Sequence, residues 1–460
     1  MKIENTPTER IVNIVEAQRE FFRSGATLKR DFRKKQLKRL LEALEKWRRP
    51  LLEALWQDLH KSEQEAVLTE LSIVEGEIGN HLHHLKRWMR VERCATPLKM
   101  MPSRSRIVSE PLGQSLIISP WNYPVQLLLN PLVGAISAGC TAVLKPSPYV
   151  PNVSLAIERM IADTFDERYI AVVQGNRDVN TALLEQRYDV IFFTGSPSLG
   201  RTVMAAAAKN LTPVVLELGG KSPCIVDKSA DVKIAAQRIA WGKTLNAGQT
   251  CIAPDYLLIH HSKQEQFIDE FKQAVKRLHG DDVRQSPHFV RMVNERAFDR
   301  VAAYLNDGRV VAGGTTVKTE RYIEPTLLVD VAPTAPVMQE EIFGPILPMI
   351  TFDKREEAER FIVEREKPLA LYYFGKEEKA WKMIRHTSSG GACINDTIMH
   401  IANEKLPFGG VGNSGMGSYH GRLSFDAFSH RRAVVITPTW IDFPFRYMPY
   451  KMWGLVKKLL

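Results

Sequence analysis

Hydrophobic positions change their spacing near residue 100 of the chain, and the two spacings predict two kinds of structure. Before that point apolar residues recur three and four positions apart, as at Leu37, Leu40, Leu41, Leu44 and Trp47. This is the period of amphipathic helices, and Pro50 is expected to open the next helix because a first helical turn tolerates proline. Polar and apolar residues then alternate over 103–110, which predicts a strand at a surface or a sheet edge.

Beyond residue 110, short apolar runs alternate with helical stretches. The first runs lie at 115–119, 141–144, 170–173, 190–193 and 214–218, with helices expected at 125–138, 154–164 and 199–209. The second runs lie at 223–226, 256–260, 346–351 and 369–374, with helices expected at 232–241 and 264–278. This order is typical of βαβ units in parallel sheets. We therefore expect an α/β protein of two doubly wound domains that share a cleft and change over near Gly219 and Gly220.

Composition narrows the class of protein. A chain of 460 residues with 44% hydrophobic and 25% charged residues is typical of a soluble protein of two or three domains. Its five cysteines are widely spaced and form no CxxC pair, which argues against disulfides and structural zinc and favours a reducing compartment. No signal-like segment or membrane-length apolar run is visible. We expect a cytoplasmic protein.

Two features invite further hypotheses. The net charge of +10 suggests nucleic-acid binding, but the basic residues lie in helical runs without interleaved aromatics or a known motif. A solvated helix face, and no nucleic-acid partner, is the better interpretation. The histidines His81, His83 and His84 have no carboxylate or cysteine at ligand spacing, so we expect an exposed polar face and no metal site.

Residues that can carry chemistry stand where the predicted strands end, which is where parallel sheets bind ligands. Cys251 follows a loop of small and polar residues at 246–250 and is either a nucleophile or a small buried hydrophobe. Asn122, between two prolines, is either an oxyanion donor or a helix cap. Glu217, inside an apolar strand, is either a general base or a buried partner of Lys221.

Two further strand ends indicate anion or ribose binding. Gly195 and Gly200 enclose four residues before a helix, as in a phosphate-binding P-loop, but Arg201 stands where that motif requires lysine. This supports only an anion site at a helix N-terminus, with a simple glycine turn as the alternative. Lys145, held beside Pro146 at a strand end, has the donors to bind ribose hydroxyls or phosphate.

Seven motifs occur together, and their order carries more information than any one of them. They are PWNYP, LKPS, FFTGSPSLG, LELGGK, GQTCIAPDY, EEIFGP and LPFGGVGNSGMGSYHG. Over about residues 10–450 the set resembles the NAD(P)-dependent aldehyde dehydrogenase superfamily. The last motif, the following Phe428-Ser429-His430 and the near absence of an N-terminal extension resemble the class 3 branch, the fatty and aromatic aldehyde dehydrogenases.

The resemblance implies a non-acylating dehydrogenase that oxidises an aromatic or medium- to long-chain aliphatic aldehyde to the carboxylic acid and reduces NAD or NADP. Cys251 would form a thiohemiacetal and then a thioester, Asn122 and the Cys251 N–H would hold the oxyanion, and Glu217 would activate water. Cys251 then needs partial access and a lowered pKa. The implied cofactor contacts are Lys145, Thr194, Gly195, Ser196, Gly200, Glu341 and Phe343. The implied aldehyde tunnel is lined by Tyr123, Trp241, Thr250 and Phe408.

The resemblance also implies an organisation of the chain. Residues 1–100 and 111–218 would bind the dinucleotide, 219–425 would form the catalytic domain, and 101–110 with 426–440 would be oligomerisation strands of a homodimer. The tail, 441–460, is aromatic and basic, with Lys451, Lys457 and Lys458. We expect it to pack on the body or on a partner subunit, with weak contact to a membrane surface as the alternative.

One position departs from the family pattern. Pro148 stands where many members carry a glutamate that binds the ribose 2′-hydroxyl. Without that carboxylate a 2′-phosphate meets less repulsion, so NADP is expected to serve at least comparably with NAD. Two other functions stay open. A thiol hydrolase lacks a histidine linked by motif to Cys251. A catalytically idle binding protein is disfavoured by the joint presence of Cys251, Glu217, Asn122 and Glu341.

Overall fold

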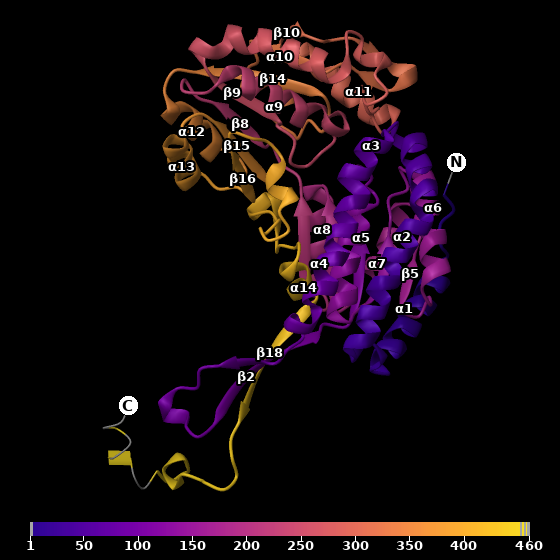
Figure 1. The fold of residues 1–460 in the computed structure, drawn as a ribbon, viewed down its shortest axis with the longest axis vertical. Coiled ribbons are helices and arrows are strands. Elements are labelled where there is room, and N and C mark those ends of the chain that lie inside the picture. Colours follow the sequence, from indigo (N-terminus) through magenta and orange to yellow (C-terminus); the bar gives the residue numbers. More distant parts are fainter. Residues whose placement is uncertain (1–2, 451–452, 455–456, 458–460) are drawn as a thin grey trace.

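The computed structural model describes residues 3–450, 453–454 and 457. The chain forms two α/β lobes and an arm that extends away from them (Figure 1). One lobe is built on a six-stranded sheet, the other on a seven-stranded sheet, and the arm on three strands. The expected architecture of two parallel-sheet units and a small β-element is confirmed.

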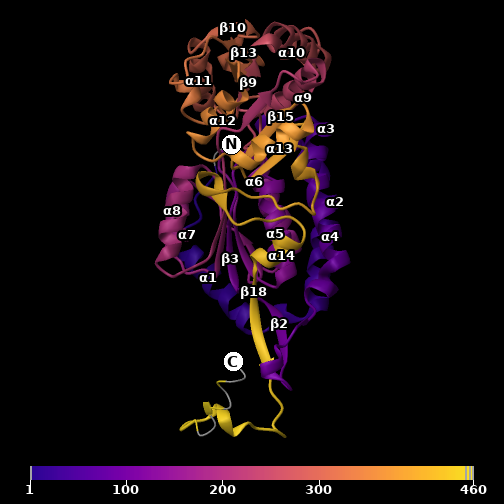
Figure 2. The same cartoon turned by 90° about the vertical axis from the view of Figure 1, so that its left-hand side faces the viewer.

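The six-stranded sheet has the order β17-β7-β6-β3-β4-β5 and is parallel except for β17. Its strands are β3 (Gln114–Ile118), β4 (Thr141–Lys145), β5 (Ile170–Val172), β6 (Val190–Gly195), β7 (Val214–Leu218) and β17 (Gly415–Met416). Figure 2 shows helices on both faces, with α7 (Arg177–Leu184) and α8 (Pro197–Ala208) opposite α5 (Gln126–Ala138) and α6 (Pro151–Thr164). Because helices cover both faces of the sheet, side chains on both sides of each parallel strand are buried, and the strand sequences are continuous apolar runs.

The seven-stranded sheet has the order β10-β13-β14-β9-β8-β15-β16 and is parallel except for β10. Its strands are β8 (Pro223–Val226), β9 (Tyr256–His260), β10 (Arg309–Ala312), β13 (Thr326–Val329), β14 (Ile346–Phe352), β15 (Ala370–Phe374) and β16 (Gly391–Ile394). Its helices are α9 (Val232–Thr244), α10 (Gln264–His279), α11 (Glu295–Ala303), α12 (Arg355–Val363) and α13 (Glu377–His386). Strands β7 and β8, on either side of Gly219 and Gly220, belong to different sheets.

Helix α1 (Thr8–Arg23) packs on the six-stranded sheet beside α7. The helices that follow form the N-terminal helical layer, which packs on α5 and α6 at the other face: α2 (Arg30–Leu59), α3 (Glu63–Ala66), the π-helical turn η2 (Val67–Leu71) and α4 (Ser72–Trp88). Pro50 lies inside α2, so the expectation that it opens a new helix is wrong. An interior proline costs about 3 kcal/mol. Leu51 and Leu55, fully buried in the next turn, offset that cost, since each buried leucine contributes about 2 kcal/mol.

The expected exposed histidine face is wrong for His81, which is fully buried. Its Nδ1 lies 2.8 Å from Oγ of Ser137 and its Nε2 lies 3.1 Å from Oε1 of Glu77. Glu77 stands one helical turn earlier, so a carboxylate does accompany this histidine. Among the described residues, no group of three or more His, Cys, Asp or Glu is placed to hold a metal ion.

The arm is a three-stranded antiparallel sheet of β1 (Glu92–Cys94), β2 (Arg104–Pro111) and β18 (Ser429–Ile436). The predicted surface strand is therefore its central strand, β2. Strand β1 comes from the range expected in the dinucleotide-binding domain. None of the helices in the described part of the chain has the length and apolarity that crossing a bilayer requires.

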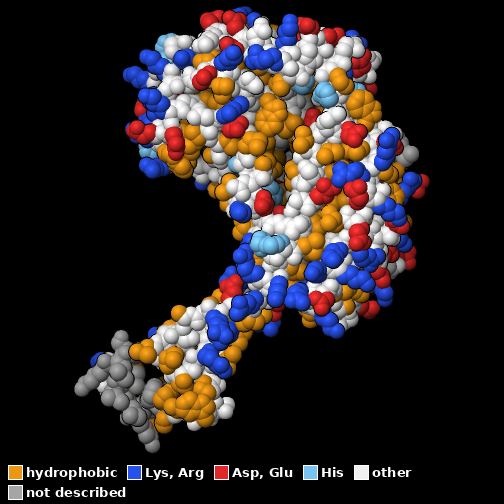
Figure 3. Space-filling view, in the orientation of Figure 1, with side chains coloured by type: hydrophobic (Ala, Val, Ile, Leu, Met, Phe, Trp, Pro, Cys, Tyr) orange, Lys and Arg blue, Asp and Glu red, His pale blue; other side chains and the backbone are white. Residues whose placement is uncertain are grey.

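The described part of the tail runs beyond the arm, away from both lobes (Figure 1). Trp440 and Met448 are 77% and 79% exposed, and hydrophobic side chains gather at the end of the arm (Figure 3). Packing of this segment on its own chain's body, one of the two expected arrangements, is therefore wrong. Of the three lysines in the tail prediction, Lys451 and Lys458 lie outside the described residues.

Candidate active site

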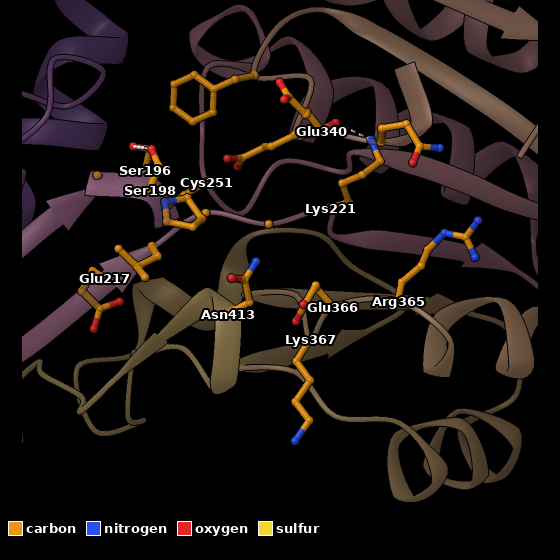
Figure 4. A pocket seen from close by; sticks show the side chains of 18 of the residues that line it. Ser196, Ser198, Glu217, Lys221, Cys251, Glu340, Arg365, Glu366, Lys367 and Asn413 are labelled. Carbon is orange, nitrogen blue, oxygen red and sulfur yellow. Dashed lines mark hydrogen bonds between the residues drawn. The ribbon is translucent and has the colours of Figure 1, made fainter. Parts of the chain in front are cut away.

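A cleft of about 1050 Å³ is lined by the segments that follow β3, β6 and β7 and by loops of the other lobe. It brings together these predicted site residues: Asn122, Thr194, Gly195, Ser196, Glu217, Cys251, Glu341 and Phe343. Figure 4 shows Ser196, Glu217 and Cys251 toward one end of the pocket and Lys221 and Arg365 toward the other. Segments that are far apart in the sequence thus meet at the carboxyl ends of the strands, as expected for parallel sheets.

The remaining predicted residues do not line this cleft: Lys145, Gly200, Tyr123, Trp241, Thr250 and Phe408. Lys145 is buried at the end of β4, where its ammonium donates to the carbonyl of Pro146 at 2.8 Å. A Cβ at Gly200 would lie 2.7 Å from Cδ2 of Leu218, so this glycine permits close packing of α8 on β7. The hydroxyls of Tyr123 and Thr250, which precede or follow Asn122 and Cys251 by one residue, form a hydrogen bond of 2.7 Å.

The loop before Cys251 is a tight left-handed turn. Asn246 and Ala247 have φ values of 51° and 52°, and Gly248 has 72°. Non-glycine residues adopt this region at a cost and need surrounding support. The fully buried Gln249 supplies part of it, because its side-chain amide donates to the carbonyl of Arg291 at 3.1 Å. The turn therefore presents the cysteine from a fixed backbone.

Cys251 is partly exposed, as predicted for a nucleophile. Its thiol pKa lies above the ordinary value, chiefly because of burial and then because of the carboxyls of Glu341 and Glu217. Hydrogen bonds from the backbone N–H groups of Cys251 and Ile252 act in the opposite direction. The expectation of a lowered pKa is therefore wrong, since the ionisable side chains that act on this thiol are acidic.

Glu217 faces the cleft from β7 with both carboxylate oxygens buried and unpaired. Burial without a partner raises the pKa of this carboxyl well above its usual range. The structural alternative, an ion pair with Lys221, is wrong because Lys221 pairs with Asp255. The unpaired carboxyl is thus available for proton transfer in the cleft.

Asn122 directs its side-chain amide to the loop that carries Cys251. Its Nδ2 donates to the carbonyl of Gln249 at 2.9 Å, and its Oδ1 has no partner. The alternative role as cap of α5 is wrong: the carboxylate of Glu70 accepts from the N–H groups of Val125 and Gln126 at 2.8 and 3.2 Å. An amide has two N–H donors, so one is left for a further acceptor in the cleft that Asn122 lines.

Glu341 and Phe343 reach the cleft from the loop before β14. Burial, followed by the nearby Asp255, raises the pKa of Glu341 to about 8. The ring of Phe343 packs edge-on against Trp121 with centroids 5.3 Å apart. The two rings form an apolar wall of the cleft where the two lobes of the molecule meet.

The N-terminus of α8 opens into the same cleft. Ser196 caps it by accepting from the N–H of Leu199 at 3.4 Å, and Ser198 lines the pocket in the first turn. Free N–H groups and the helix dipole favour an anion here. Arg201 does not replace the P-loop lysine, because its guanidinium donates to Oδ1 of Asn413 at 2.6 Å at the cleft rim.

Arg300 lines the cleft and was not predicted. Its guanidinium donates to the carbonyls of Glu341 and Ile342 at 3.2 and 2.7 Å, which holds the loop that carries Glu341. Arg300 lies in α11, whose sequence has the polar face of an ordinary surface helix. No local pattern distinguishes it, and only the tertiary structure identifies its contact.

The chain matches the model of the Aldehyde dehydrogenase family over residues 1–434. It is 45% identical over 447 residues to 4,4'-diaponeurosporen-aldehyde dehydrogenase of Staphylococcus aureus, covering 96% of this chain and 97% of the relative. It is 47% identical over 439 residues to aldehyde dehydrogenase family 3 member B1 of Mus musculus, covering 94% and 93%. It is 46% identical over 427 residues to "Aldehyde dehydrogenase, dimeric NADP-preferring" of Rattus norvegicus, covering 93% and 94%.

The fold agrees with these matches. The solved structure described as the substrate-bound state of Staphylococcus aureus AldH superposes with a TM-score of 0.96 at 44% identity, covering 98% of this chain and 99% of that one. The chain belongs to the aldehyde dehydrogenase family, and its class 3 resemblance is confirmed. It is an oxidoreductase that oxidises aldehydes to carboxylic acids.

Proposed function

We propose that this oxidation proceeds covalently on Cys251, with Asn122 and Glu217 in separate roles. The observation that carries the proposal is the convergence of these three residues on one cleft. The Cys251 sulfur adds to the aldehyde carbon, and the second N–H of the Asn122 amide, with the Cys251 N–H, stabilises the developing oxyanion. Loss of a hydride then leaves a thioester. Water, activated by Glu217, cleaves the thioester to the acid and returns the thiol.

The cleft fits a nicotinamide dinucleotide. The capped N-terminus of α8 suits a pyrophosphate, Thr194 offers a buried, unpaired hydroxyl, and Glu341 offers a carboxyl for a ribose. When bound, the oxidised nicotinamide accepts the hydride and adds a positive charge that favours the Cys251 thiolate. Lys145 remains a proposed adenosine-ribose ligand, although it lies outside the cleft lining.

NADP serves at least comparably with NAD in this proposal. Pro148, next to the exposed Tyr149, presents no carboxylate to a 2′-phosphate. The rat relative, which is named as preferring NADP, supports the same assignment.

The substrates are aromatic or medium- to long-chain aliphatic aldehydes. The cleft wall of Trp121 and Phe343 is apolar, and so are the predicted tunnel residues Trp241 and Phe408. Phe408 is buried and Trp241 partly buried. An apolar surface around the reacting carbon binds such side chains through the hydrophobic effect.

The protein acts as a cytoplasmic homodimer in this proposal. The five cysteines are all free thiols, which suits a reducing compartment. The arm presents β18, an eight-residue edge strand, and such an edge is a template for pairing with a second copy. A relative is named as dimeric. The exposed aromatic tail would then pack on the partner subunit, with a membrane surface as its alternative contact.

Replacement of the thiol tests the mechanism. Parent, C251S and the control C94S, whose cysteine lies in the arm, are assayed with benzaldehyde and hexanal and with each cofactor, following the absorbance of reduced nicotinamide. C251S should lose at least about a thousandfold in kcat, while C94S should match the parent. Equal rates for C251S and parent would refute the covalent role. Ester turnover without nicotinamide would reveal a thiol hydrolase side activity.

A further inference from the structure

A buried ion pair lies behind the active-site loops, in the N-terminal helical layer. Nζ of Lys61 lies 2.7 Å from Oε1 of Glu70, and both side chains are fully buried. Neither residue lines the cleft. Burying two charges costs several kcal/mol, and good geometry with further hydrogen bonds is needed to recover it.

Those further hydrogen bonds go to the segment that carries Asn122. Lys61 donates to the carbonyl of Asn122 at 3.1 Å, and its ammonium lies 4.3 Å from the centre of the Tyr123 ring. The second oxygen of Glu70 accepts from the N–H groups of Val125 and Gln126, at the start of α5. The ion pair therefore holds the backbone on both sides of the Pro124 turn.

The same carbonyl is also held from the nucleophile side. Nδ2 of Asn246 donates to the carbonyls of Asn122 and Gln249, at 3.0 Å in each case. The N–H of Asn246 in turn donates to Oε1 of Glu65 at 2.9 Å. The Asn122 carbonyl thus accepts hydrogen bonds both from the helical layer, through Lys61, and from the cysteine loop, through Asn246.

We propose that Lys61 and Glu70 are positioning residues that hold the Asn122 amide at the oxyanion. The inference rests on the proposed role of Asn122. An oxyanion donor works only if its direction is set before the reaction, and small displacements cost rate. Glu70 is delivered by η2, a π-helical turn, and such turns often accompany functional sites. Without the pair, the carbonyl of Asn122 loses one of its two side-chain donors, Lys61, and keeps the other, Asn246.

The variant K61M/E70Q removes the charges together, so that neither charge is left buried alone. The glutamine oxygen can still accept from Val125 and Gln126. We expect a folded protein, kcat/KM for hexanal reduced tenfold or more, and KM for NADP within twofold of the parent. The control R48M/E75Q removes the ion pair that joins α2 and α4 elsewhere in the same layer, and it should keep the parent kcat/KM.

Coupling to N122A separates positioning from general stability. If Lys61 and Glu70 act through Asn122, adding K61M/E70Q to N122A should lower kcat/KM by less than a further twofold. An equal drop in both backgrounds, or a parent-like K61M/E70Q, would overturn the inference. A parent-like N122A would instead refute the proposed oxyanion role. If K61M/E70Q does not fold, the single variant E70Q is used instead. It should lower kcat/KM at least threefold in the parent background and leave it unchanged in the N122A background. Any other result overturns the inference.

Discussion

Gly219 and Glu341 contact each other at the cleft: the place of a Cβ atom on Gly219 is occupied by the carboxylate of Glu341. G219A should therefore displace this carboxylate, and because the displaced group is the end of a flexible side chain, the fold should survive. If Glu341 binds the nicotinamide ribose, loss of that contact should raise KM for NAD and NADP about tenfold, or about 1.4 kcal/mol. Initial rates and a thermal melt measure the two effects.

The matched control for this variant is G220A. Its Cβ would lie nearest to Pro368 and Leu369, with Cα of Pro368 at 3.3 Å, and it keeps the Gly220 N–H that acts on Glu341. A cofactor KM that rises equally in both variants would show that the loop, and not the Glu341 carboxylate, sets cofactor affinity.

The buried Glu341 should make stability depend on pH. Its pKa rises from 4.5 to about 8 on folding, mainly because of burial and then because of Asp255, against the opposing effects of the Gly220 N–H, Lys221 and Arg300. Below about pH 4.5 both states hold the proton. Between pH 4.5 and 8 only the folded state holds it, so stability falls as pH rises, and the loss is complete above pH 8.

E341Q removes this ionisation at nearly constant volume. Its melting temperature should therefore exceed that of the parent by several degrees at pH 9 and differ little at pH 5. Melts in a buffer series of constant ionic strength measure the difference. A gap that is independent of pH would assign the effect to packing, and the raised pKa of Glu341 would then be wrong.

Replacement of Glu217 should affect the release of the acid and leave the hydride loss that precedes it unchanged. Its carboxyl pKa is raised by burial, and only the deprotonated form is a base, so the release step should accelerate as pH rises. E217Q should keep the first-turnover burst of reduced nicotinamide and lose about a hundredfold or more in the steady-state rate. Stopped-flow absorbance between pH 6 and 10 measures both phases. Loss of the burst itself would place Glu217 in the first half of the reaction.

Sequence patterns predicted the strands, and they indicated candidate catalytic residues that the fold brings to one cleft, because both depend on local signals. Parallel strands covered on two faces are apolar runs, and Cys251 and Asn122 lie in compact motifs at their ends. The burial of Lys61 and His81 had no such signal. Each lies in a polar stretch, and each is buried only because a partner, Glu70 or Glu77, lies close enough to compensate it.

The prediction of a lowered pKa for the Cys251 thiol was wrong for a related reason. A nucleophilic thiol is expected to have a lowered pKa, but burial, followed by the acidic side chains of Glu341 and Glu217, raises the pKa of Cys251. These two glutamates come from distant segments that only the fold brings together. Pro50 shows the opposite case, in which a strong local signal was overruled by the apolar face of α2 that continues beyond it.

Pro148 provides the sharpest test of cofactor choice. It precedes Tyr149 and the start of α6 at Pro151, at the carboxyl end of β4. If the adenosine ribose binds there as proposed, an introduced carboxylate would lie close to it. A carboxylate about 4 Å from a 2′-phosphate repels it by about 1–4 kcal/mol in partly solvated surroundings. P148E should therefore lower kcat/KM for NADP at least tenfold relative to NAD. The neutral control P148Q should leave the ratio within threefold of the parent, and equal shifts in both variants would attribute the effect to the loss of proline. If the parent already prefers NAD by more than a hundredfold, about 2.7 kcal/mol, the absence of a carboxylate at this position does not decide the cofactor.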